Sequence, residues 1–229
     1  MSGFGHFWSQ GDFITRSVAT LLLLMSVSAW VVILWKGWLL QRVRRDLLRA
    51  VPAFWAAPSV DAAREQLAAF DREAVVTPLV AAALAAPPGG TLEAHGHVDS
   101  QLTRRLRDAL HGVLQHLQFG QVLLASIGST APFIGLFGTV WGIYHALISI
   151  SASGQITIEK VAGPVGEALV MTAAGLAVAI PAVLAYNIFG KRVAASEAEL
   201  EGFAHDLREM ILDTHREAAP TPPERAVEA

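Results

Sequence analysis

The chain has 229 residues, of which 53% are hydrophobic and only 16% are charged. Soluble domains carry about 25% charged residues, so this composition indicates a membrane protein. The net charge of -3 provides no basic surface for nucleic acid, and the absence of cysteine excludes disulfides and cysteine-ligated metals.

Three apolar stretches predict three transmembrane helices, at residues 13–36, 126–150 and 161–190. The first contains residues 17–35 without a single charge, and about 19 apolar residues suffice to cross a hydrocarbon core of ~30 Å. The third contains one charged residue, Glu167. The predicted fold class is an all-α integral membrane protein.

The first stretch could alternatively be a cleaved signal peptide, since Val27-Ser28-Ala29 is an acceptable cleavage site. A signal peptide has an apolar region of about 7–15 residues after a basic start. Here the apolar run continues to Trp35, and Asp12 precedes it. These features favour a retained membrane span.

The distribution of basic residues predicts the orientation of the spans, because cytoplasmic loops are enriched in Lys and Arg. Only Arg16, Lys160 and Lys36, the last residue of the first span, lie outside the two segments that follow the first and third spans. We therefore expect residues 37–125 and 191–229 to be cytoplasmic. The complementary segments, 1–12 and 151–160, are expected to be periplasmic.

The cytoplasmic segments have a helical pattern. Residues 60–73 and 99–118 are both amphipathic; in the second, one face carries Leu102, Leu106, Ala109, Val113 and Leu117. The sequence AAPPGG at 85–90 predicts a break between helices. We expect helices that continue the three spans into a cytoplasmic helical domain, and a disordered tail from about residue 218.

Three polar residues within the spans are candidates for function: Thr139, Glu167 and Thr172. An ionisable residue within a membrane costs at least ~2.5 kcal/mol and usually faces a bundle interior or water. Glu167 could instead lie close enough to the outer surface to be solvated. Each threonine hydroxyl could either line a polar path or bond to the carbonyl four residues earlier on its own helix.

Small residues in the second and third spans predict close helix packing. Glycine costs roughly 1 kcal/mol against alanine inside a helix, but in lipid it lets a neighbouring backbone approach closely. The predicted packing glycines are Gly135, Gly138, Gly142 and Gly175. Pro132 and Pro181 are expected to kink their helices, since each removes a backbone hydrogen bond.

No motif predicts an enzyme, a metal site or a cofactor. His95-Gly96-His97 lacks further metal ligands nearby, the chain has no phosphate-binding P-loop, and no nucleophile–base pair is visible. His145, near the outer end of the second span, is interpreted as an interfacial polar residue.

The segments STAPFIGLFGTVWGIYHAL and VAGPVGEALVMTAAGLAVAIPAVLAYN resemble the ExbB/TolQ/MotA family of proton-channel stator subunits. The resemblance is densest over residues 125–192 and extends to most of the chain through the three-span topology. MotA-type members have four spans, which this chain lacks. The N-terminal stretch is more similar to ExbB, and a TolQ-like subunit of the Tol-Pal envelope system is the alternative.

The resemblance implies a homopentamer in the inner membrane of a Gram-negative bacterium, embedded in its lipids, around an ExbD dimer. Such a complex uses the proton motive force to energise TonB for outer-membrane transport of iron-siderophores, haem or vitamin B12. It implies that Thr139, Glu167 and Thr172 line the pore, while the proton-binding aspartate belongs to ExbD. A purely structural scaffold, with Glu167 paired to a basic residue, is a further alternative.

Overall fold

The structure, a computed structural model, describes residues 12–86, 90, 96–153 and 158–218. These residues form helices and no strand, as predicted. The helices are α2 (Phe13–Ala56), α3 (Val60–Phe70), α4 (Thr77–Leu84), α5 (Val98–Gln118), α6 (Gln121–Ser153) and α7 (Ile158–Ala218). Most of the predicted N-terminal segment, half of the Pro-Gly break, part of the 151–160 loop and nearly all of the tail lie outside the described residues.

Three helical stretches are long and apolar enough to cross a membrane: Phe13–Ala56, Val98–Ile148 and Ala162–Glu217. Each overlaps one of the three predicted spans. The first and third continue without interruption well beyond the apolar segment, to Ala56 and Ala218. The second differs, because a two-residue break at Phe119 and Gly120 separates α5 from α6.

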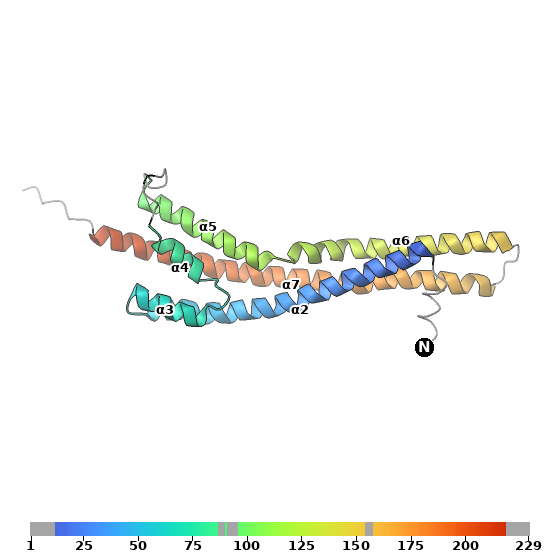
Figure 1. Cartoon of the computed structure of the whole chain (residues 1–229), viewed down its shortest axis with the longest axis horizontal. Coiled ribbons are helices and arrows are strands. Elements are labelled where there is room, and N and C mark those ends of the chain that lie inside the picture. The colour runs from blue at the N-terminus through green and yellow to red at the C-terminus, as the bar shows by residue number, and fades with distance from the viewer. Residues whose placement is uncertain (1–11, 87–89, 91–95, 154–157, 219–229) are drawn as a thin grey trace, which may run out of the picture. The chain divides into compact units, whose positions relative to one another are not determined.

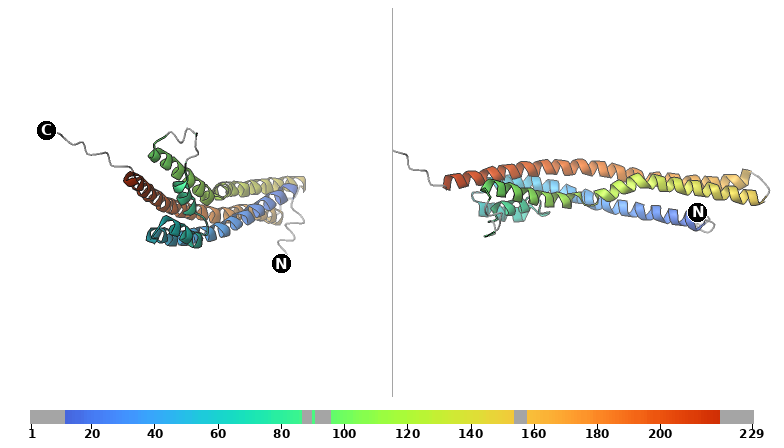
Figure 2. Two further views of the ribbon diagram at one scale, coloured as in Figure 1. Left: turned by 60° about the vertical axis from the view of Figure 1, so that its left-hand side comes forward. Right: turned by 90° about the horizontal axis from the view of Figure 1, so that it is seen from above.

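The chain folds as two compact units. The first comprises residues 1–38 and 119–191. In its described part, α6 runs alongside the first half of α7, and the first half of α2 lies against them (Figures 1 and 2). Most of its buried side chains are apolar, for example Leu22, Leu124 and Ala182. Many large apolar side chains point outward, as expected of a lipid-facing surface, so this is the membrane-spanning unit.

The second unit comprises residues 39–118 and 192–229. Its described part contains α3, α4 and α5 with the second halves of α2 and α7 (Figure 1). An aromatic cluster joins α2 to α7, with the rings of Phe54 and Phe203 centred 5.3 Å apart at 83°. The predicted apolar face of α5 is buried at Leu102, Leu106, Val113 and Leu117, and Ala109 is half-buried.

Two buried carboxylates hold the connection between α3 and α4. Asp71 accepts hydrogen bonds from the backbone N–H groups of Val75, Val76 and Thr77 at 2.6–2.9 Å, which starts α4 without a conventional side-chain cap. Asp46 on α2 accepts hydrogen bonds from two further backbone N–H groups of this connection. The short helices are thereby tied to the long α2.

Candidate functional site

The site is built on the closest approach of α6 and α7, where two glycines face each other. A Cβ added to Gly135 would lie 2.6 Å from the Met171 carbonyl oxygen and 3.1 Å from the Gly175 Cα. A Cβ added to Gly175 would lie 2.6 Å from the carbonyl oxygen of Ala131. The neighbouring atoms are backbone and cannot move aside, so only glycine permits this contact.

One helical turn beyond Gly135, the close contact brings two threonines together. The Thr139 hydroxyl lies 2.5 Å from the Thr172 hydroxyl on α7, 3.0 Å from the Ala168 carbonyl oxygen and 3.2 Å from the Gly135 carbonyl oxygen. Thr139 is 7% exposed in the single chain, and Thr172 is half-buried. Thr139 thus combines the own-helix bond considered from sequence with a bond to the neighbouring helix.

The carbonyl partners determine how protons are shared between the two hydroxyls. A threonine hydroxyl has one hydrogen to donate, and a carbonyl oxygen can only accept. Thr139 therefore satisfies this site best by donating to a carbonyl oxygen and accepting from Thr172. In this arrangement the Thr172 oxygen can still accept a hydrogen bond from a donor that approaches its exposed side.

Glu167 precedes Ala168 on α7 and is exposed in the single chain. It is five residues from Thr172, about 140° around the helix and ~7.5 Å along it. The carboxylate and Thr172 therefore lie on different sides of α7, more than one helical turn apart. A partner that contacts both must reach α7 from more than one direction, or from more than one copy of the chain.

Two further predicted glycines also lie in the α6 contact. A Cβ at Gly142 would be 2.9 Å from the Ala168 Cβ, and one at Gly138 would be 3.1 Å from both the Met171 Cβ and a methyl group of Val18 on α2. Gly138 thus lies where all three helices meet. α6 continues through Pro132 and α7 through Pro181 without a break in the helix.

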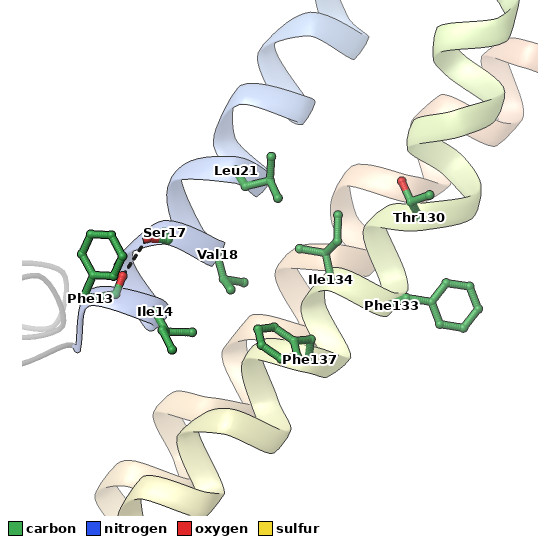
Figure 3. A pocket seen from close by; sticks show the side chains of 9 residues that line it. All are labelled: Phe13, Ile14, Ser17, Val18, Leu21, Thr130, Phe133, Ile134 and Phe137. Atoms are coloured by element: carbon green, nitrogen blue, oxygen red, sulfur yellow. Dashed lines mark hydrogen bonds between the residues drawn. The ribbon is translucent and has the colours of Figure 1, made fainter.

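A groove of about 580 Å³ lies between α2 and α6 (Figure 3). Its lining is apolar except for two hydroxyls, those of Ser17 and Thr130. Each of these donates to a carbonyl oxygen of its own helix, at 2.8 Å and 2.6 Å respectively. The groove is therefore an apolar surface of the membrane unit and not a polar path.

His145 lies toward the C-terminal end of α6, away from the break at Phe119 and Gly120. Its Nδ1 is 2.8 Å from a carboxylate oxygen of Asp12, and its ring is centred 4.9 Å from that of Trp141. These half-exposed groups fit an interfacial position. Among the described residues, no cluster of three or more His, Asp or Glu side chains could hold a metal ion.

Sequence reasoning missed three features of this unit. Lys36 is completely buried, although its place in the sequence indicates only a basic residue that flanks the first span. Gly120 has a φ of +79° at the α5–α6 break. Gly128 is a further contact glycine, since an added Cβ would lie 2.5 Å from a Val183 methyl group. The position of Gly128 in an apolar span was the one signal that could have indicated its role.

These features define an all-α membrane protein with three spans, whose second and third spans pack tightly around a threonine pair, with the carboxylate of Glu167 on another side of the third span. Comparison with known families makes the assignment specific. Residues 66–202 match the MotA/TolQ/ExbB proton channel family, and the chain belongs to this family.

Individual relatives agree with the family assignment. The chain is 40% identical over 212 residues to the biopolymer transport protein ExbB of Neisseria meningitidis, covering 90% of this chain and 96% of the relative. It is also 40% identical over 220 residues to ExbB of Xanthomonas campestris, covering 91% and 86%. The Tol-Pal system protein TolQ of Haemophilus influenzae is 41% identical over 115 residues, covering 50% and 49%.

Proposed function

We propose that this chain is the ExbB-type subunit of an inner-membrane proton channel. With ExbD it would use the proton motive force to energise TonB, and thereby outer-membrane transport of iron-siderophores, haem or vitamin B12. The support is that similarity to ExbB proteins extends over nearly the whole chain, whereas similarity to TolQ of Haemophilus influenzae covers half of it.

The proposed topology places residues 1–12 and 151–160 in the periplasm, and residues 37–125 and 191–229 in the cytoplasm. Its support is the concentration of Lys and Arg in the latter two segments. The second compact unit corresponds closely to these segments, and its buried carboxylates and ion pairs suit an aqueous compartment.

The observation that carries the proposal is the exposure of Glu167 in an otherwise apolar span. A carboxylate facing lipid would cost at least ~2.5 kcal/mol per chain. Assembly removes this cost if the exposed side of α7 faces other proteins. We propose a homopentamer in which this side faces a central pore occupied by an ExbD dimer.

In this assembly each of the three polar residues has a distinct role. Glu167 would accept and release protons, since it carries the only carboxylate of its span. Thr172 would donate its hydrogen to Thr139, and its oxygen would accept a hydrogen bond from a protonated carboxylic acid of ExbD. Thr139 would hold Thr172 in position through its bonds to Thr172 and to the Ala168 carbonyl.

The driving force is adequate for such a cycle. One proton crossing 100 mV releases ~2.3 kcal/mol, which exceeds the worth of a single hydrogen bond within a membrane. Proton transfer to the carboxylate of ExbD would therefore suffice to break and remake its bond to a threonine, and to shift the inner dimer against the ring.

The experiment compares Glu167→Ala with Glu199→Ala, an exposed glutamate on the same helix in the other unit. The first variant should assemble with ExbD but abolish TonB-dependent iron-siderophore uptake, and the second should leave uptake unchanged. Normal uptake in Glu167→Ala would refute the proposal. Co-purification of TolR and TolA in place of ExbD and TonB would establish the TolQ-like alternative.

A further inference from the structure

The break between α5 and α6 lies against α2. Gly120 adopts a φ of +79°, a left-handed conformation that costs other residues energy. A Cβ added there would be 2.8 Å from a methyl group of Val32 on α2, so space as well as conformation requires glycine. The start of α6 is regular from this point, with the Leu124 N–H donating to the Gly120 carbonyl oxygen at 3.1 Å.

One helical turn after Val32, Lys36 binds this break directly. Its Nζ donates a hydrogen bond to the Phe119 carbonyl oxygen at 2.6 Å, and both residues belong to the membrane unit. The lysine is 0% exposed. A lysine at the end of a span ordinarily extends its ammonium group to water. Burying the charge is costly unless it is hydrogen-bonded, so the contact with the break accounts for its inward direction.

The neighbours of Lys36 reinforce the contact. The ring of Trp35 packs edge-on against that of Phe119, with centroids 5.8 Å apart. On the other side, a Cβ added to Gly37 would lie 3.8 Å from the Phe189 ring of α7. Trp35 and Lys36 therefore contact the break at Phe119, and Gly37 lies close to Phe189 of α7.

We infer that Lys36 is a positioning residue that holds the break and thereby sets the position of α6 against α7. α6 begins at Gln121, 18 residues or ~27 Å before Thr139. A helix held at its beginning and at the Gly135–Gly175 contact cannot slide or turn, so the Thr139 hydroxyl stays opposite Thr172. That this positioning matters for proton transfer rests on the proposed function. The positioning of α6 by Lys36 does not depend on that function.

The test uses the absence of native cysteine. In the full-length chain with its ExbD partner, Thr139→Cys and Thr172→Cys are combined, because the two hydroxyls lie 2.5 Å apart. The rate of disulfide formation with copper–phenanthroline is followed by loss of labelling with a maleimide mass tag. This rate reports the position of α6 against α7 and needs no proton gradient, so its outcome is independent of the proposed function.

Adding Lys36→Met should slow cross-linking about tenfold, the equivalent of one lost charge-assisted hydrogen bond. Lys36→Arg, which keeps a charged donor, and Lys191→Met, which removes an exposed lysine of the same unit, should each stay within about twofold of the parent. Unchanged cross-linking in Lys36→Met would overturn the inference, as would equal slowing in Lys36→Arg and Lys36→Met.

Hydrogen exchange on the unsubstituted chain provides the second measurement, should Lys36→Met not accumulate. The inference requires the amide of Leu124, at the start of α6, to exchange as slowly as the amides at the Gly135 contact. Exchange at Leu124 about a hundredfold faster than at Gly135, a difference equivalent to about 2.7 kcal/mol, would overturn it.

Discussion

The contact between Gly135 and Gly175 allows a quantitative prediction for Gly135→Ala. The added methyl group would lie 2.6 Å from the Met171 carbonyl oxygen, whereas ordinary contact begins at 3.4 Å. Because the obstacle is backbone, α6 and α7 must separate by about 0.8 Å at this point. The same movement would lengthen the 3.0 Å bond from Thr139 to the Ala168 carbonyl oxygen beyond hydrogen-bonding distance.

Two terms contribute to the expected loss of stability. Overpacking a well-packed contact costs about 1–3 kcal/mol, and an interhelical hydrogen bond in a membrane is worth about 0.6 kcal/mol on average and up to ~1.7 kcal/mol. Gly135→Ala should therefore lower the free energy of unfolding by about 2–4 kcal/mol relative to a glycine substitution that meets no obstacle.

Gly190→Ala is the matched control, since an added Cβ there meets no atom within 4 Å in the single chain. Both substitutions gain the same helix propensity, so the difference isolates the contact. Unfolding by SDS in mixed micelles, followed by tryptophan fluorescence, measures both variants. If Gly135→Ala is as stable as Gly190→Ala, the described packing of α6 on α7 is wrong.

Three further variants test other parts of the structure. Thr139→Val keeps the shape but loses the hydroxyl, and should destabilise the membrane unit by about 0.6–1.7 kcal/mol in SDS unfolding. The Thr130 hydroxyl donates within α6, so Thr130→Val should cost less. Equal costs for the two variants would contradict the interhelical bond of Thr139. Phe54→Ala should cost about 3–5 kcal/mol because Phe54 is 4% exposed in the aromatic cluster. Rapid proteolysis of the second unit would report this loss, and native-like resistance would contradict the packing. Asp71→Ala should cost about 3 kcal/mol, since three backbone N–H groups lose their acceptor. Asp61 is exposed, so Asp61→Ala should change stability by less than about 1 kcal/mol. Equal protease sensitivity of these two variants would refute the capping role of Asp71.

The three spans could be predicted because, in a chain of this composition, an apolar run of about 19 residues without a charge is rarely anything but a membrane span. The helix at Val98–Gln118 could also be predicted, since its leucines recur at helical spacing and its arginines do not share their face. Both signals are local, and each is repeated over many residues. The residues at which the spans end inside α2 and α7 were harder to predict, because both helices continue from apolar into polar sequence without a stop signal.

The break at Gly120 could not be predicted, because a single glycine inside a helical pattern is usually tolerated. What requires glycine there is its φ of +79° together with the closeness of Val32, a residue 88 positions earlier in the chain. Lys36 illustrates the same limit, since its place beside an apolar span indicates an ordinary flanking charge. Its burial depends on the Phe119 carbonyl, which only the folded chain brings to it.

Part of the candidate site could be predicted from the sequence. Thr139 and Glu167 were evident as polar residues in apolar spans, and the resemblance to the family named the same positions. The sequence left open whether the Thr139 hydroxyl bonds to its own helix, and the structure shows bonds to both helices. That choice depends on how closely α6 and α7 approach, a distance set by glycines on both of them.

The most direct test of the proposed function is proton flux through the chain reconstituted with ExbD in liposomes, measured with an internal pH-sensitive dye under an imposed potential. Glu167→Gln keeps the size and hydrogen-bonding capacity of the side chain but cannot exchange protons. Flux through the Glu167→Gln complex should fall at least about tenfold below that of the unsubstituted complex, whereas Glu199→Gln should leave it unchanged. Unchanged flux in Glu167→Gln would show that Glu167 does not carry protons, and would favour a structural role for it.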